Sequence, residues 1–398
     1  MKRYSLKTAD RIRGVLRMLP LIVALCCTAA IASCSGGDKP ATKDSTSVIA
    51  DRVWAFSQAH PDGFTLDIRS MTQPTEGIAV SYAATQHSHS RSQLDKVVAH
   101  ALGHDGYVGG WLNTEDRLYY FDSTKLFAET ALKEALQFGK ENGQWSAFVL
   151  SAGADIPVSG KVAEIVARDT LLVGTTGDYR PLSFCESDGS HWGFGIEMAR
   201  EMANALGVET KFVKTSWPTL TADVLAEPQA FDLAIGGITI TEARTAAMLM
   251  SEGYLANGKT ILCRATESDR YKSLADIDRP EVRVMVNPGG LNEKFARERL
   301  TQATITVHQK NEEIPALIAE GRADVMIAEI TEAPYYVQSD PRLAAPLLSQ
   351  PFTRGEIGVL MKKGQDDLLQ MVNATIGKMK SDGRLRRLHE KYGLVYAY

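Results

Sequence analysis

The residues that could do chemistry lie in the second part of the chain, near the ends of apolar runs. These runs have the length and composition of buried parallel strands: Leu171–Gly174, Leu233–Ile235 and Val282–Val286. In open α/β sheets a ligand binds at the carboxyl ends of the strands. A small polar ligand would therefore meet the polar residues Asp178, Thr239, Arg244, Asn287 and Glu332. Of these, the Arg244 guanidinium suits a carboxylate, because it stays charged and donates two parallel hydrogen bonds.

The elements around these residues alternate between strand and helix in two lobes. Residues 165–258 and 357–398 are predicted to form lobe one, and residues 259–356 are predicted to form lobe two. Residues 194–206 have the apolar spacing of an amphipathic helix, with Gly207 as its stop. The segments 260–264 and 358–363 are predicted to be hinge strands between the lobes. The pattern predicts an α/β fold that binds its ligand in a cleft and closes over it.

Five motifs carry a resemblance to a known family: GTTGDYRP (174–181), TSWP (215–218), NGKT (257–260), VNPGGLNEKFA (286–296) and AEITEA (328–333). Across residues 165–398 the chain resembles the family 3 solute-binding proteins and, among them, the cyclohexadienyl dehydratases. The resemblance implies a two-lobed periplasmic binding protein-like fold of type II. It also implies a lyase of phenylalanine biosynthesis that needs no cofactor. Such an enzyme converts prephenate to phenylpyruvate, and arogenate to phenylalanine.

The resemblance assigns the positive charges of the site to Arg244 and Lys259. Arg244 is expected to hold the α-carboxylate of the ligand with help from the Thr239 hydroxyl, and Lys259 is expected to hold a second carboxylate. Trp217 is expected to form an aromatic wall of the pocket. The same binding set also includes Asp178 and Tyr179. From the residues alone, Arg244 equally suits a surface salt bridge, Lys259 a solvated hinge position, and Trp217 a packed core.

The motif at 286–296 supplies uncharged contacts. Asn287 and Asn292 are expected to touch the substrate, and Gly290 lets the backbone turn before a helix that begins near Leu291. Amides at a helix N-terminus attract anions. Leu291 stands where the resembling proteins usually have Thr, whose hydroxyl assists carboxylate binding, so only the backbone amides remain for that task.

Glu329 and Glu332 separate two functions. In amino-acid-binding members of the family, an acid at the first position pairs with the ammonium group of the ligand, and Glu329 occupies this position although Asp is commoner. Glu332 falls where the resembling dehydratases have their proton donor, which protonates the ring hydroxyl as it leaves with carbon dioxide. Burial beside another acid would raise the pKa of Glu332 toward that role. The structural alternative is a carboxylate favoured by the dipole at a helix N-terminus.

Two other functions stay open at this point, because catalytic and binding-only proteins share the fold. A non-enzymatic lipoprotein would deliver an amino acid to the permease of an ABC importer and would not need Glu332. A sensor would use residues 50–160 to report closure of the cleft to a partner. The net charge of −4 gives no indication of nucleic-acid binding.

The first 33 residues are predicted to be a lipoprotein signal peptide. Basic residues precede the short apolar stretch Leu19–Ile31, which Pro20 interrupts and which is short for a membrane span. The sequence IASC at 31–34 is typical of a bacterial lipobox. Lipidation of Cys34 would anchor the protein to the periplasmic or cell-surface face of a membrane. A plain secretory signal is the alternative, and residues 34–49 are predicted to be a flexible tether.

Residues 50–160 are predicted to form a small α+β module of unknown role. Strand-like segments lie at 53–56, 63–68 and 78–82, helical segments at 92–102 and 128–140, and a strand pair within 109–127. His100 and His104 could share a helix face as in a zinc site, but the Glu of the zinc motif is missing. Packed or surface histidines are the simpler interpretation, and no metal is expected. An oxidising compartment would permit a disulfide between Cys185 and Cys263, although their distance in sequence does not favour one.

Overall fold

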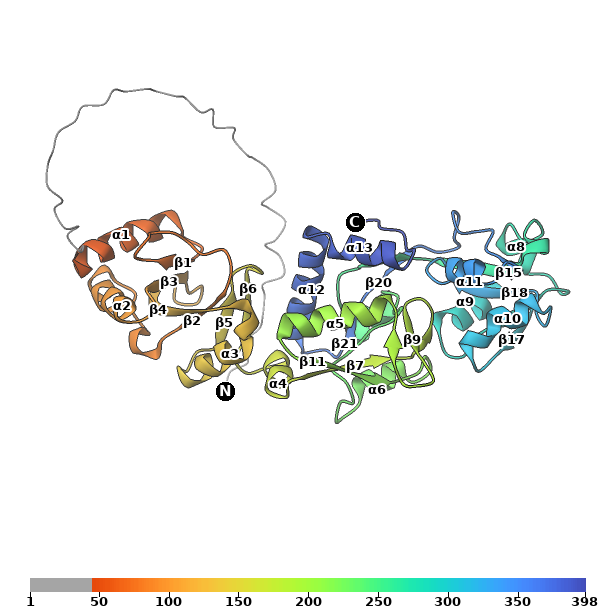
Figure 1. Ribbon diagram of the computed structural model, residues 1–398, viewed down its shortest axis with the longest axis horizontal. Coiled ribbons are helices and arrows are strands. Elements are labelled where there is room, and N and C mark those ends of the chain that lie inside the picture. The colour runs from red at the N-terminus through yellow and green to blue at the C-terminus, as the bar shows by residue number, and fades with distance from the viewer. Residues whose placement is uncertain (1–44) are drawn as a thin grey trace, which may run out of the picture. The chain divides into compact units, whose positions relative to one another are not determined.

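The computed structural model describes residues 45–398, so the predicted signal peptide and Cys34 lie outside the described residues. Residues 45–160, called the N-terminal module below, form an antiparallel sheet that packs against helices (Figure 1, orange to yellow). The strands run in the order β1 (Phe64–Asp67), β3 (Tyr107–Leu112), β4 (Tyr119–Phe127), β2 (Ile78–Ser81), β5 (Ser146–Val149) and β6 (Ala154–Pro157). The helices are α1 (Thr46–Ala59), α2 (Arg91–Gly103) and α3 (Leu132–Glu141). The predicted α+β module is confirmed.

The first helix corrects two sequence predictions. Because α1 begins at Thr46, residues 46–49 of the predicted tether are helical, and the strand predicted at 53–56 is wrong. Ser45 caps the helix, since its hydroxyl accepts a hydrogen bond from the Val48 amide at 3.4 Å. The buried side chains recur every three or four residues, which is the period of a helix and not that of a strand: Ile49, Ala50, Val53 and Ser57.

Lobe one is built on a sheet with three parallel strands. The strand order is β11 (Glu209–Lys214), β7 (Thr170–Thr175), β12 (Leu233–Ala234), β21 (Leu360–Met361) and β13 (Leu249–Met250), of which β11, β7 and β12 are parallel. The strands predicted at 171–174 and 233–235 are confirmed. The helices are α4 (Lys161–Ala167), α5 (Phe194–Leu206), α6 (Leu220–Leu225), α7 (Glu242–Ala247), α12 (Asp366–Ser381) and α13 (Arg384–Lys391). Gly207 ends α5 in the left-handed conformation at φ 67°, as predicted.

Lobe two repeats the plan with a second sheet. Its strand order is β17 (Thr304–Val307), β16 (Arg283–Val286), β18 (Val325–Glu329), β15 (Lys259–Arg264) and β19 (Leu343–Ala344). Strands β17, β16 and β18 are parallel, and β15 runs antiparallel to β18. The strand predicted at 282–286 is therefore confirmed as β16. The helices are α8 (Leu274–Ile277), α9 (Leu291–Arg299), α10 (Ile314–Ala319) and α11 (Ala333–Ser339).

The crossing between the lobes lies just before the segments that the sequence suggested. Strands β14 (Leu255–Asn257) and β20 (Gly355–Ile357) form a separate antiparallel ladder. Each leads within a few residues into a strand of one lobe, β15 or β21. The predicted hinge strands at 260–264 and 358–363 thus belong to the lobe sheets. The reason is burial, since β15 is buried along nearly its whole length, as expected for an inner strand.

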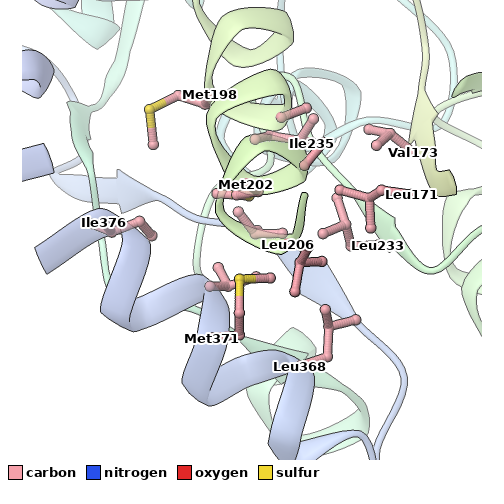
Figure 2. Close-up of a cluster of buried hydrophobic side chains, with 14 of the residues drawn as sticks. Leu171, Val173, Met198, Met202, Leu206, Leu233, Ile235, Leu368, Met371 and Ile376 are labelled. Carbon is pink, nitrogen blue, oxygen red and sulfur yellow. The ribbon is translucent and has the colours of Figure 1, made fainter. Parts of the chain in front are cut away.

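The core of lobe one extends into the N-terminal module. In lobe one, Leu368, Met371 and Ile376 of α12 face Met202 and Leu206 of α5 (Figure 2). The same buried cluster includes module side chains from β2, α3, β5 and β6: Ile78, Val80, Leu132, Ala135, Leu136, Ala147 and Ile156. Burying one large apolar side chain contributes about 1.5–3 kcal/mol. The module and lobe one therefore stabilise each other by continuous apolar packing.

Polar contacts follow the same boundary. The Lys378 ammonium of α12 forms an ion pair with Glu129 of the module at 3.1 Å. Lys133 of α3 forms an ion pair with Asp169 at 2.6 Å. Within the described range, Cys185 and Cys263 are free thiols, and no helix combines the length and apolarity that membrane crossing requires.

Candidate functional site

A polar cavity lies between the two lobes and encloses about 330 Å³ of empty space, including solvent at its mouth. Its lining residues are Tyr179, Trp217, Gly237, Thr239, Arg244, Lys259, Asn287, Gly290, Leu291, Asn292, Asn311 and Glu329. Contacts cross it directly. Tyr179 of lobe one donates a hydrogen bond to Glu329 of lobe two, and Asn311 of lobe two donates one to the Asp178 carbonyl at 3.1 Å. The lobes are therefore closed on each other at the cavity.

Two adjacent strands of lobe two bring a cation and an anion together. In the antiparallel register of β15 and β18, Lys259 lies opposite Glu329. The Lys259 ammonium contacts Glu329 Oε1 and Asn292 Oδ1, each at 2.5 Å, and both charged side chains are buried. Burial alone would raise the pKa of Glu329. The charge of Lys259 and the hydrogen bonds from Lys259 and Tyr179 outweigh it, so the pKa lies below its ordinary value.

Glu332 differs from Glu329 in having almost no compensation. It stands at the start of α11 with 0% exposure, and it makes no side-chain capping bond to that helix. Its Oε1 accepts a hydrogen bond from the Glu329 amide at 3.1 Å, and no described residue bonds to its Oε2. Burial raises the pKa of Glu332 well above its ordinary value, and the charge of Glu329 raises it further. Both effects favour the neutral carboxylic acid, which is the form that can donate a proton.

Arg244 offers a free positive charge on the lobe-one side of the cavity. Its Nη1 donates to the Thr239 carbonyl at 2.6 Å, which holds the guanidinium near the end of the loop after β12. Within residues 45–398 no carboxylate forms an ion pair with it, so the surface salt bridge considered above is not formed. Burial lowers the pKa of Arg244, although Glu329 partly opposes this. A half-buried guanidinium without an ion-pair partner among the described residues is suited to a ligand carboxylate.

The aromatic wall is built from two rings and one carboxylate. Trp217 and Tyr179 meet edge to face at 5.8 Å between ring centroids. The indole of Trp217 donates to Asp178 Oδ1 at 3.1 Å. Burial raises the pKa of Asp178. Asp178 does not itself line the cavity; it orients the indole that does.

The predicted turn and helix start lie on the lobe-two side. Gly290 precedes α9, and a side chain in its place would meet the Asn287 amide at 3.2 Å. Asn287 is buried, and its Oδ1 has no partner in the described part of the chain. Leu291 lines the cavity at the position where the resembling proteins usually have the hydroxyl of Thr. Asn311 Oδ1, on the same side, also has no partner in the described range, so this face offers two uncommitted acceptors and an apolar surface.

Sequence reasoning missed several residues of the site. Gly237 lines the cavity at φ 99°, and a Cβ there would lie 2.3 Å from the Tyr179 ring, so only glycine fits. The Gly-Gly pair after β12 was a usable signal. Asn257 begins the NGKT motif but was not singled out, and Asn311 had no signal. Asn257 donates to Thr239 and accepts from Thr331, which ties the hinge to the cavity.

The structure gathers most of the predicted binding set around one cavity. Nine predicted residues line it: Tyr179, Trp217, Thr239, Arg244, Lys259, Asn287, Gly290, Asn292 and Glu329. Asp178 and Glu332 lie directly behind the lining. In the N-terminal module, His100 and His104 stack on each other at 3.9 Å. No metal-binding group of three or more His, Cys, Asp or Glu occurs within residues 45–398.

A family model identifies the protein family to which this sequence belongs. The model described as bacterial extracellular solute-binding proteins, family 3, matches residues 171–395. The chain belongs to this family. Family 3 proteins are extracellular by that description, which supports a location outside the cytoplasm.

Relatives with different activities share the family. The chain is 38% identical to cyclohexadienyl dehydratase of Pseudomonas aeruginosa over 205 residues, which are 52% of this chain and 76% of that protein. It is 29% identical over 233 residues to the L-cystine-binding protein TcyJ of Escherichia coli, covering 58% and 86% of the two chains.

Among solved structures, the chain is similar to the ancestral amino acid-binding protein AncCDT-1, a precursor of cyclohexadienyl dehydratase. The TM-score is 0.55 at 34% identity, over 58% of this chain and 99% of the other. The type II binding-protein fold is thus shown. The homology includes both an enzyme and proteins that bind amino acids.

Proposed function

We propose that the protein is a cyclohexadienyl dehydratase that converts prephenate to phenylpyruvate, with Glu332 as the general acid. One observation carries the proposal: Glu332 is fully buried beside Glu329, has a raised pKa, and keeps one oxygen without a partner among residues 45–398. A carboxylate that only bound a cationic ligand group would need the opposite environment, one that favours its charged form.

The reaction balances with one proton from this acid. The bond between the ring and its carboxylate breaks, carbon dioxide leaves, and the electron pair enters the ring. The ring hydroxyl departs at the same time, and Glu332 protonates it so that it leaves as water. Glu332 then regains a proton from solvent. General acid catalysis of this kind contributes roughly 10²–10⁴-fold to the rate.

The charges around the cavity suit the substrate. Prephenate carries two carboxylates, and the site holds two cations, Arg244 and Lys259, in a common cavity. Arg244 has no ion-pair partner among the described residues and would bind the carboxylate of the side chain. Lys259, held by Asn292 and Glu329, would face the ring carboxylate. Trp217 would pack against the ring.

A second candidate is an amino-acid-binding protein of an importer, which the similarity to the L-cystine-binding protein favours. The two candidates are separated by incubating the purified protein with prephenate and measuring phenylpyruvate formation, with titration of free amino acids in parallel. Turnover supports the dehydratase. Tight binding of an amino acid without any turnover of prephenate or arogenate would replace it with the importer function.

We also propose a lipid anchor at Cys34, on the evidence of IASC at 31–34. The Cys34→Ala variant should lose metabolic lipid labelling and leave the membrane fraction, because acyl chains on this residue would hold the protein at the surface. Cys26→Ala is the matched control, since Cys26 lies within the predicted signal peptide. Labelling that persists in Cys34→Ala would contradict the anchor.

A further inference from the structure

We propose that Glu329 is a positioning residue inside the protein, not a clamp for a ligand ammonium group, and that the site therefore favours a keto-acid dicarboxylate over the corresponding amino acid. The part of the inference that concerns substrate preference rests on the proposed dehydratase function. The part that concerns the role of Glu329 depends only on contacts within the chain.

Both oxygens of the Glu329 carboxylate are already bound. Oε1 meets the Lys259 ammonium at 2.5 Å, and Oε2 accepts the Tyr179 hydroxyl. The Glu329 side chain is 6% exposed. Each carboxylate oxygen keeps a second lone pair, so a ligand ammonium would either share the carboxylate with Lys259, against the repulsion between the two cations, or displace Lys259. Displacing Lys259 would leave a buried cation without its anion, and such a separation is strongly unfavourable.

Among residues 45–398, the cavity lining offers an ammonium group no other anionic partner. Glu329 is the acidic member of the lining set, and Asp178 lies behind the wall with Oδ1 bound to the Trp217 indole. Two lining residues keep an uncommitted acceptor within the described range, Asn287 Oδ1 and Asn311 Oδ1, and both are neutral amides. An amide oxygen accepts a hydrogen bond from a cation but does not neutralise it. A keto group needs no anion, so it fits this lining better.

Glu329 also holds Glu332 in two ways. Its amide donates to Glu332 Oε1 at 3.1 Å, which leaves Oε2 as the oxygen available to carry the proton. Its negative charge lies three residues away on the same turn and opposes ionisation of Glu332. Lys259 acts in the opposite sense, so the protonation of Glu332 depends on the Lys259–Glu329 pair remaining together.

The test is the Glu329→Gln variant in the full-length protein, with Glu312→Gln as a control that removes an exposed carboxylate near Asp178. Without the charge at 329, Glu332 should ionise more easily. The fall of kcat at high pH should then move to lower pH by about one unit or more, while Glu312→Gln leaves it in place. Glu329→Asp, which restores the charge, should move it back toward wild type.

Substrate preference gives an independent readout. In wild type, kcat/KM for prephenate should exceed that for arogenate by at least about tenfold, because the arogenate ammonium would be buried without an anion. A pH profile unchanged in Glu329→Gln, together with a selective rise in KM for arogenate, would overturn the proposal in favour of an ammonium clamp.

If wild type turns over neither substrate, the dehydratase function fails and the positioning role is judged by other measurements. Calorimetric titration with amino acids should then give affinities for Glu329→Gln within a few-fold of wild type. Infrared titration of the carboxyl band, assigned with Glu332→Gln, should show Glu332 ionising at lower pH in Glu329→Gln. Loss of amino-acid binding in that variant, with no shift of the band, would refute the positioning role.

Discussion

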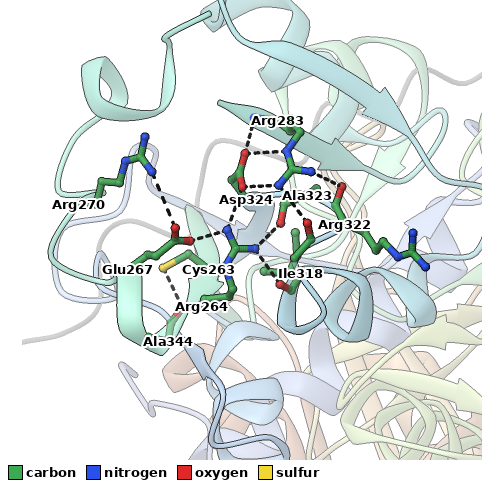
Figure 3. A network of polar contacts seen from close by, with 11 residues as sticks. Cys263, Arg264, Glu267, Arg270, Arg283, Ile318, Arg322, Ala323, Asp324 and Ala344 are labelled. Atoms are coloured by element: carbon green, nitrogen blue, oxygen red, sulfur yellow. Dashed lines mark hydrogen bonds and ion pairs between the residues drawn. The ribbon is translucent and has the colours of Figure 1, made fainter. Parts of the chain in front are cut away.

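The same two strands, β15 and β18, carry an ion pair at each end, and the two ends are built in opposite ways. At the end away from the cavity, Asp324 precedes β18 and bonds to Arg264 of β15 at 2.8 Å and to Arg283 at 2.7 Å (Figure 3). Arg264 also bonds to the Ile318 and Ala323 carbonyls. At the cavity end, Lys259 and Glu329 form the corresponding pair.

The two ends differ in how many of their acidic side chains are bonded to a cation. Burial alone would raise the pKa of Asp324, but its bonds to Arg283 and Arg264 hold the pKa far below the ordinary value. The cavity end has a second acid, Glu332, and no cation in the described part of the chain bonds to that acid. The pKa of Glu332 is therefore raised, whereas that of Asp324 is lowered. The bonded arginines favour the charged form of Asp324, whereas Glu332, without a cation, favours its neutral form, as the proposed general acid requires.

The largest effect on activity is expected from changing Glu332, the buried acid that has no bonded cation. Glu332→Gln keeps the shape and the bond from the Glu329 amide but removes the dissociable proton. It should lower kcat for prephenate by roughly 10²–10⁴-fold and change KM by only a few-fold, since the proton matters mainly in the transition state. Steady-state kinetics checks both numbers.

The matched control for that variant is Asp324→Asn, the same kind of change at the compensated end. Its kcat should stay close to wild type. A Glu332→Gln protein that retains wild-type turnover would remove Glu332 from the mechanism and leave the uncompensated acid without a function.

Arg244→Ala should have the next largest effect, and it should fall on binding. Removing a charged partner from a hydrogen-bonded pair typically costs at least about 2 kcal/mol, which corresponds to a rise of about 30-fold in the dissociation constant. Equilibrium binding of prephenate to the slow variant Glu332→Gln, with and without Arg244→Ala, measures this directly. Arg283→Ala, which removes an arginine at the other end of the sheet, should leave affinity unchanged. Equal affinities with and without Arg244 would place the carboxylate elsewhere.

The parallel strands and the cavity set could be predicted because they depend on local patterns. Apolar runs predict β7, β12 and β16, and the polar residues that follow these strands meet at one edge of each sheet. Glu329 could be located in the same way, but its partners could not. Its two oxygens are bound by Lys259 and Tyr179, which lie 70 and 150 positions away in the chain. A local sequence motif does not reveal which residues so far away along the chain will be its partners.

Features formed by lobe closure and by packing between modules escaped prediction for the same reason. Asn311 reaches the Asp178 carbonyl across 133 positions of sequence. The apolar face of α12 would look alike whichever partner covered it, so its contact with the N-terminal module was not visible. Helix α1 was missed because Val53 and its neighbours suit a strand locally, and only the burial every three or four residues reveals the helix.

The smallest effect is expected from Asp324→Asn, and it should fall on stability. Asn keeps the shape but loses the charge that holds two partly exposed arginines, so unfolding should become easier by about 1–2 kcal/mol. Because the pKa of Asp324 is depressed in the folded state, its contribution is complete above the ordinary pKa near 4 and is lost as the pH falls through the folded value. Urea unfolding of both proteins should therefore show a gap that is constant from pH 7 down to about pH 5 and narrows below about pH 4. A gap that persists unchanged into acid would mean that Asp324 stabilises the sheet by shape alone, and the contrast between the two ends of β15 and β18 would lose its electrostatic basis.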